Sequence, residues 1–279
     1  MARTNARNIY INDNDKDKLA EIYGGVIDAI QKGAVSEQIK NKNYSGNPSS
    51  GSVEISRFVN ATIKDQGAAR TAAKGDEIIN KPVVVNIDTD KEIVEEVSKI
   101  DLQLHGVTGI AERRKTNHIK RMQAYLDREF FACAVSEGSS FTLTGETIIE
   151  KIESLILEVE NTENDYVDGV DRDMLVLTVT PNIYSKIKNY INETTNSLTG
   201  VTEKLFNDVR IFSNHRQTKD VICMIDGAVA QPVLTDEYDL EKIPLSNNFG
   251  LELFFSKGTK AIMPDLIQYG NLTAGNASV

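Results

Sequence analysis

The spacing of apolar residues changes along the chain, and the first change separates an N-terminal arm from the remainder. Residues 1–50 are polar and rich in turn-forming residues, and one amphipathic helix is predicted among them. The apolar residues of this helix are Leu19, Ile22, Tyr23, Val26 and Ile30. The remainder of the segment carries too little apolar surface to order itself. We therefore expect an arm that needs a partner.

From residue 52 the apolar residues alternate with polar ones, which predicts a strand of ~12 residues, about 40 Å long. A small, polar tip follows at 65–75, and a return strand is predicted at Val83, Val85 and Ile87, after Pro82. A two-stranded ribbon is marginal in water on its own. This one has too little apolar sequence to bury both faces, so we expect it to lie on another surface, as an assembling subunit would require.

Apolar residues between 93 and 104 lead into the longest helical pattern, which predicts a helix over 107–135. One stripe carries its apolar residues, interrupted at Lys115: Ala111, Ile119, Met122, Leu126, Phe130 and Cys133. Such a helix would be ~43 Å long, and it would contain well over twice the ~11–12 residues of a mean globular helix. The Gly-Ser-Ser cluster at 138–140 is expected to end it.

The following segment mixes short helices with strands. Thr147 and Glu150 have capping-box spacing at the start of a helix that runs to Val159, and Thr180 with Pro181 begins another that includes Ile187. Strands are predicted at 174–179, 209–212, 221–225, 228–234, 251–255 and 260–263. Helices and strands are grouped in blocks and no internal repeat is present, so the class is α+β.

Composition narrows the class of protein. The chain has 279 residues, 40% of them hydrophobic and 26% charged, as in a soluble globular protein. The N-terminus has no apolar core of a secretory signal, so we expect the chain to stay in a cytoplasm. Cys133 and Cys223 are far apart and are predicted to be buried free thiols. A net charge of −10 argues against a protein that coats nucleic acid with its whole surface.

The search for catalytic or metal-binding residues gives none. No phosphate-binding glycine loop and no nucleophile elbow occurs, and His105, His118 and His215 lack metal-ligand spacing and are expected at the surface or at helix ends. The acidic runs at 13–17 and 168–173 suggest calcium, but the first lacks the glycine and glutamate of a calcium loop. Solvated loop charge is the favoured interpretation. No cofactor, metal or catalytic residue is predicted.

One charged stretch lies within the long helix. Residues 111–128 contain six cations and two carboxylates, a local charge of +4 (six minus two). The cations are Arg113, Arg114, Lys115, Lys120, Arg121 and Arg128, and the carboxylates are Glu112 and Asp127. Three interpretations stay open: a solvated helix face with i,i+4 ion pairs, non-specific contact with phosphates, or contact with acidic neighbouring subunits.

An arm, a long hairpin, one very long helix and a compact α/β segment follow one another in the order seen in major capsid proteins of tailed bacteriophages, the Hong Kong 97 type. Residues 125–138 (YLDREFFACAVSEG) resemble the end of that family's spine helix, and residues 174–187 (MLVLTVTPNIYSKI) its axial strand, proline and short helix. Residues 209–214 resemble the next strand, and 249–265 the return to the peripheral domain. The resemblance covers nearly the whole chain.

The resemblance implies an N-arm (1–50), an extended loop (51–88), a peripheral domain with the spine helix (89–145 and 235–279) and an axial domain (146–234). It implies a structural protein, not an enzyme, that self-assembles into hexamers and pentamers of an icosahedral head around double-stranded DNA. The expected partners are its own copies, a scaffolding protein, a portal and DNA, with no membrane. The expected locations are the virion and, during assembly, the host bacterial cytoplasm.

Two features of some relatives are not expected. Only about 50 residues precede the hairpin, which is too short for a cleaved scaffolding segment. Lys64 and Lys74 lie at the hairpin, but neither matches a crosslinking position. Three rival functions remain open: an encapsulin-like compartment for protein cargo, a small-molecule enzyme built on residues 174–234, and a tail component.

Overall fold

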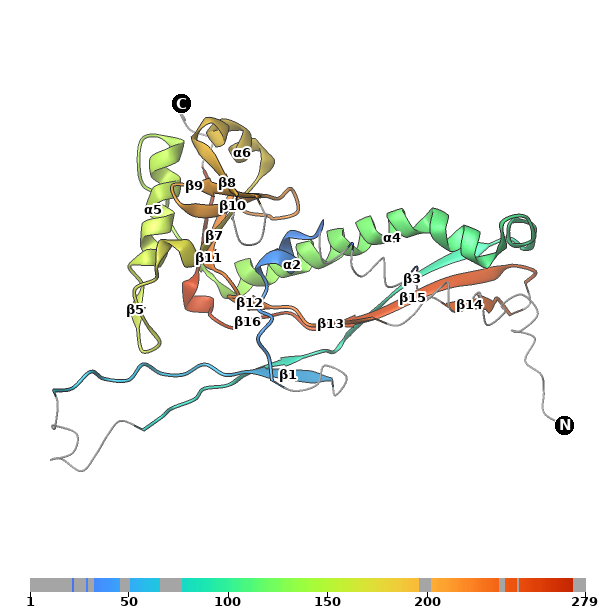
Figure 1. Ribbon diagram of the computed structural model, residues 1–279, viewed down its shortest axis with the longest axis horizontal. Coiled ribbons are helices and arrows are strands. Elements are labelled where there is room, and N and C mark those ends of the chain that lie inside the picture. Colours follow the sequence, from blue (N-terminus) through green and yellow to red (C-terminus); the bar gives the residue numbers. More distant parts are fainter. Residues whose placement is uncertain are drawn as a thin grey trace.

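The computed structural model describes residues 22, 29, 33–45, 51–65, 77–195, 202–235, 239–244 and 246–272. A sheet with two short helices forms one end of the molecule, and a long helix runs from it beside two long strands to the opposite end (Figure 1). The acidic run at 13–17, most of the predicted arm helix, most of the hairpin tip and Lys74 lie outside the described residues. Ile22 of that helix is described and is buried, as its apolar spacing predicts.

The long helix α4 (Lys99–Glu137) contains the helix predicted over 107–135. Gly106 has φ 68° and ψ 168°, so two short turns before it are set off from the regular helix after it. Ser98 caps the first turn by accepting a hydrogen bond from the Asp101 amide at 3.0 Å. At the other end Gly138 is needed for space, because a Cβ there would lie 2.6 Å from the carbonyl oxygen of Ala134.

Two nine-residue strands run beside α4, namely β3 (Thr89–Val97) and β15 (Phe249–Lys257), in an antiparallel pair. Strands β13 (Val233–Thr235) and β14 (Asp239–Lys242) pair with the other edge of β15. Alternate residues of β15, Leu251, Leu253 and Phe255, are buried against Met122 and Leu126 of α4. This first core fixes the long helix on the narrow sheet.

The sheet next to the C-terminal end of α4 has seven strands in the order β4-β17-β11-β7-β10-β9-β8. Their bounds are β4 (Ser139–Ser140), β7 (Leu175–Val179), β8 (Ile191–Thr195), β9 (Thr202–Phe206), β10 (Val209–Ser213), β11 (Val221–Ile225) and β17 (Ile267–Gly270). Pairs β7–β10 and β4–β17 are parallel, and the other pairs are antiparallel. The class is therefore mixed helix and sheet, as predicted.

Every residue of the central strand β7 is buried, because helices cover both faces of the sheet. Leu175 and Leu177 point to the side of α5 (Ile148–Glu160) and α6 (Pro181–Ile187), whereas Val176 packs with Phe130 and Phe131 of α4. This split follows from the two-residue period of a strand. The predicted capping box at the start of α5 is formed.

The hairpin differs from its prediction. Strands β1 (Ser52–Ile55) and β2 (Val83–Asn86) have four residues each, so the expected ~12-residue strand is wrong in length. Beyond Ile55 the two branches are joined by an isolated bridge between Phe58 and Asn80. The paired base packs on the same chain, because Val53, Ile55 and Val85 form a core with Ala230 and Ile262. The base therefore lies on a surface of its own chain, and the expectation that an assembly partner covers the ribbon is wrong at this base.

Part of the predicted arm is also integrated into the fold. Helix α2 (Val35–Ile39) lies against α4, and Ile39 is fully buried. The Ser36 amide donates to Asp127 Oδ1 at 2.9 Å, and the Asn41 amide donates to the Val229 carbonyl at 2.8 Å. The expectation that this part of the arm needs a partner is therefore wrong for residues 34–41.

The remaining short elements connect these parts. They are β5 (Glu163–Asn164), β6 (Val167–Asp168), β12 (Val229–Ala230), β16 (Lys260–Ala261) and the 3₁₀ turns η3 (Arg172–Met174), η4 (Lys188–Tyr190) and η5 (Pro264–Leu266). Strands β5 and β6 form a hairpin that projects from the end of α5, toward the extended loop (Figure 1).

Candidate assembly surfaces

The distal half of the extended loop (51–88) presents apolar side chains to solvent. Ile63 is 99% exposed, Ile78 is 88% exposed and Phe58 is 54% exposed. Single exposed apolar residues are normal on a protein surface. Here they gather on a narrow ribbon that extends beyond the body of the molecule (Figure 1). This part of the loop has apolar area available for a partner.

A polar clamp holds the middle of the loop to the β5–β6 hairpin. Arg57 Nη2 lies 2.7 Å from Asp265 Oδ2, and the Arg57 guanidinium lies 4.0 Å from the centre of the Tyr166 ring. Asn164 also donates to Asp265 Oδ2, at 2.6 Å, and the Asn60 amide donates to the Asp165 carbonyl at 2.9 Å. Burial raises the pKa of Asp265, but the hydrogen bonds from Arg57 and Asn164 outweigh it and leave that pKa lowered.

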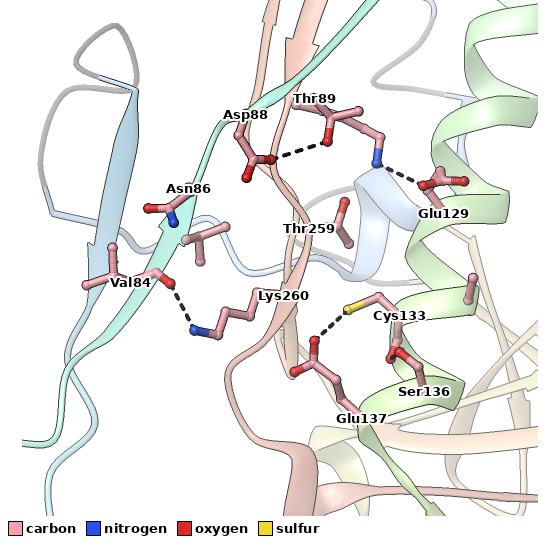
Figure 2. A pocket seen from close by; sticks show the side chains of 13 residues that line it. Val84, Asn86, Asp88, Thr89, Glu129, Cys133, Ser136, Glu137, Thr259 and Lys260 are labelled. Carbon is pink, nitrogen blue, oxygen red and sulfur yellow. Dashed lines mark hydrogen bonds and ion pairs between the residues drawn. The ribbon is translucent and has the colours of Figure 1, made fainter.

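A cavity of about 540 Å³ lies between β2, the turn from β15 to β16 and the last turns of α4 (Figure 2). Cys133 Sγ lies 3.5 Å from Glu137 Oε1, and Lys260 Nζ donates to the Val84 carbonyl at 3.1 Å. Burial, together with the charge of Glu137, raises the pKa of Cys133 to about 12. At neutral pH this thiol is protonated and a poor nucleophile.

Both cysteines are free, as predicted. Cys223 is fully buried in the seven-stranded sheet, whereas Cys133 is half-buried at the cavity.

The base of the extended loop packs closely against the β15–β16 turn at this cavity. A Cβ at Gly258 would lie 2.1 Å from the carbonyl oxygen of Asn86, so only glycine lets the β15–β16 turn approach β2 so closely.

The predicted basic residues of α4 fall into two groups. Arg114 faces the sheet and forms a bidentate ion pair with Glu95 of β3. His118 is 1% exposed, and its Nε2 lies 3.1 Å from Glu95 Oε2. The hydrogen bond from Arg114 is the largest cause that lowers the pKa of Glu95. Lys115 is half-buried on a neighbouring side of the helix.

The expectation of a surface or helix-end position is wrong for His118. It lies four residues before Met122 and therefore on the buried stripe of the helix. His105 is half-buried and His215 is exposed. Asp168, Asp171 and Asp173 of the acidic loop are exposed. Among the described residues, no group of three His, Cys, Asp or Glu side chains is arranged to hold a metal ion.

The second group faces solvent, and we name it the basic stripe: Arg113, Lys120, Arg121 and Arg128. All four are exposed, and no carboxylate of the described residues lies within 4.0 Å of their nitrogens. The i,i+4 ion pairs that one interpretation of this stretch required are therefore not formed. Asp127, which belongs to the same stretch of sequence, is buried and paired with Arg216 instead.

No helix in the described ranges has the length and apolar character that a membrane span requires. No known family model matches the sequence. No curated protein matches it either.

Solved structures do match. A chain from Mycobacterium phage Che8 superposes with a TM-score of 0.56 at 19% identity, over 81% of this chain and 85% of that one. The capsid of Cyanophage P-SCSP1u gives a TM-score of 0.56 at 13% identity, over 83% and 85%. A virus-like particle from Pyrococcus furiosus gives 0.55 at 13% identity, over 90% and 98%. The predicted likeness is confirmed at the level of fold: the chain has the fold of phage capsid proteins of the Hong Kong 97 type.

Proposed function

We propose that this chain is the major capsid protein of a tailed bacteriophage, which self-assembles into hexamers and pentamers of an icosahedral head around double-stranded DNA. The observation that carries the proposal is the exposed apolar end of the extended loop on a capsid fold. Ile63 and Ile78 gain nothing from the body of their own chain, so their burial on a neighbouring copy would stabilise an assembly.

The loop and the body provide two different surfaces, so the contact between copies is heterologous. Heterologous contacts close into rings when the rotation between copies fits, as hexamers and pentamers require. Each contact is small, but every subunit makes several at once, and linked contacts strengthen one another. On this view the function of the chain is to form a shell of defined shape, and no described residue is assigned a catalytic role.

We propose that the parts of the chain keep the division that the resemblance implies: arm 1–50, extended loop 51–88, peripheral domain 89–145 with 235–279, and axial domain 146–234. The separate cores support it, since one lies between α4 and the β3–β15 pair and another between α5, α6 and the seven-stranded sheet. Strands β4 and β17, which the proposed division assigns to the peripheral domain, pair with this sheet and so would connect the two domains.

The proposal includes further partners and a location. A separate scaffolding protein would direct curvature, a portal would occupy one vertex, and the shell would mature in the host bacterial cytoplasm before it becomes part of the virion. The capsid fold and the exposed loop support the proposal of a shell. The further partners follow only from that proposed role.

An encapsulin-like compartment is the second candidate. It is favoured by the match to the virus-like particle from Pyrococcus furiosus, which covers 98% of that chain. A head and a cargo compartment would use the same shell contacts and differ in their contents, namely DNA or protein.

Negative-stain electron microscopy of the purified chain, expressed alone and with the products of neighbouring genes, tests the proposal. Closed shells of uniform size support it, and nuclease-protected DNA inside them selects the phage head over the compartment. A chain that stays monomeric at high concentration in both settings, with a well-folded thermal transition, overturns both candidates. Open tubes would point to a tail component instead.

A further inference from the structure

The basic stripe has a linear geometry. Successive residues of an α-helix are rotated by about 100°, which places Arg113, Lys120, Arg121 and Arg128 within a sector of about 100° on the surface of α4. With a rise of about 1.5 Å per residue, the first and last of them are about 22 Å apart along the axis. The four cations therefore form a row along a straight element.

No large apolar side chain is exposed among the cations of the row. Asn117 and Ala124 lie between the cations on the same face. From residue 108 to residue 137, α4 has no large apolar side chain among the exposed ones. Protein–protein contacts usually have an apolar core from which charged residues are depleted. The stripe therefore lacks the feature that a contact with another copy would need, in contrast to the exposed loop.

The surroundings are positive at Arg121 and Arg128 and mixed in charge at Arg113. Arg121 and Arg128 border a cavity of about 210 Å³ together with Lys91 of β3, and Glu92 is the carboxylate at its edge. Arg113 borders another cavity, which is also lined by the Glu95–Arg114 pair and by Glu96 and Asp101. Neither cavity brings a carboxylate of the described residues within 4.0 Å of a stripe nitrogen. No carboxylate in the described ranges therefore competes with an external anion for the stripe cations.

We propose that the basic stripe binds the phosphate backbone of a nucleic-acid duplex without sequence preference. The inference rests on the proposed function, because it locates where a shell of this chain would meet its genome. Lysine and arginine on an exposed face are the usual partners of backbone phosphates, and such contacts carry no base information. A row of cations matches a linear polyanion better than it matches the compact surface of a folded protein.

The expected strength follows from counterion release. For B-form DNA the slope of log K against log salt is about −0.9 per phosphate neutralised, so four cations predict a slope of about −3.6. The chain as a whole carries a net charge of −10, which repels DNA elsewhere. The contact is therefore weak, sensitive to salt and confined to the stripe.

The test uses the purified full chain and a fluorescent 20-base-pair duplex, whose anisotropy is followed over a series of salt concentrations. In the double variant Lys120→Gln/Arg121→Gln the slope is expected to become less steep by about 1.8, because two phosphate contacts are lost. Lys186→Gln/Lys188→Gln removes two equally exposed cations from the region of α6 and η4 and should leave the slope unchanged. Thermal unfolding of both variants should match that of the parent chain, because all four side chains are exposed.

Two results would overturn the inference: an equal fall in the slope of both variants, or an unchanged slope in the stripe variant, whether its shells form normally or shell assembly is lost. Loss of assembly with an unchanged slope would assign the stripe to an acidic face of a sister copy. Shell formation by the parent chain is scored separately by electron microscopy. Normal shells with an unchanged slope reject the stripe and keep the proposed function, whereas a parent chain that forms no shells, either alone or with the products of neighbouring genes, rejects the proposed function.

Discussion

Replacing Ile63 and Ile78 by serine should separate folding from assembly. Both side chains lie beyond the clamp at Arg57 and are almost fully exposed, so the isolated chain loses no buried contact when they are changed. Substitutions at such surface positions usually change stability by no more than about 0.5 kcal/mol. We expect the thermal transition of the unassembled double variant to match that of the parent.

The effect on assembly should be large. Complete burial of an isoleucine side chain contributes roughly 1.5–3 kcal/mol, so covering both residues on a neighbouring copy would contribute roughly 3–6 kcal/mol per subunit. Because 1.4 kcal/mol corresponds to a factor of ten, the association constant of one contact should fall by at least about 100-fold. The concentration at which shells first form should rise accordingly.

The assay is light scattering over a dilution series, with electron microscopy of each sample. Ile63→Leu/Ile78→Leu keeps the apolar area and should assemble as the parent does. Ile55→Ala serves as a variant that affects folding itself. Ile55 is buried in the core at the loop base, so its truncation should cost roughly 2–5 kcal/mol of folding stability. Shell formation by the serine variant at the parent's threshold concentration would refute the reasoning.

Three further outcomes are expected. Gly258→Ala should lower stability by roughly 1–3 kcal/mol in thermal unfolding, because its Cβ meets a carbonyl of β2, whereas Gly109→Ala, with only ordinary contacts, should not. Arg172→Met should lower the melting temperature at neutral pH, because Arg172 forms ion pairs with Glu160 at 2.6 Å and with Glu153 at 2.7 Å. Arg172 lowers the pKa of Glu160, so this contribution is complete above about pH 4.3 and is lost as pH falls through the lowered value. The thiol of Cys133, with a pKa of about 12, should react with a disulfide reagent at pH 8 much more slowly in the folded chain than in the unfolded one.

The long helix was predictable because its apolar stripe follows helical spacing without a break in its second half. Its predicted start at 107 agrees with the structure, since Gly106 separates the regular helix from the turns before it. The same spacing contained a signal for His118. That residue lies four positions before Met122, on the buried stripe, and only its polar character suggested the surface.

The length of the loop strands could not be read from alternation. Alternating residues show which face a side chain would take, but a strand also needs regular pairing with a partner. Beyond Ile55 and Val83 the same register continues in single bonds, from the Lys81 amide to the Arg57 carbonyl at 2.8 Å and from the Val59 amide to the Ile79 carbonyl at 3.0 Å. With the isolated bridge between Phe58 and Asn80, this pairing is too sparse to extend the regular strand.

The packing of residues 33–45 depends on partners that are distant in the sequence. Ser36 finds its acceptor in Asp127, and Asn41 bonds to Val229. A largely polar segment of this kind has no periodic signal, because single buried residues such as Ile39 and hydrogen bonds to particular remote groups hold it. Strands β8 and β9 escaped prediction for a related reason: their sequences, INETT and TEKLF, are largely polar.

The division of apolar surface within the extended loop explains how one chain can fold alone and still associate. Val53, Ile55 and Val85 fix the loop base on the chain's own strands, and Arg57 ties the next residues to Asp265, so the loop has a defined direction before any partner arrives. A loop without this base would have to lose its conformational entropy on association, which weakens binding. Because the base is already ordered, the exposed isoleucines can contribute their burial to contact between copies with a smaller entropic cost.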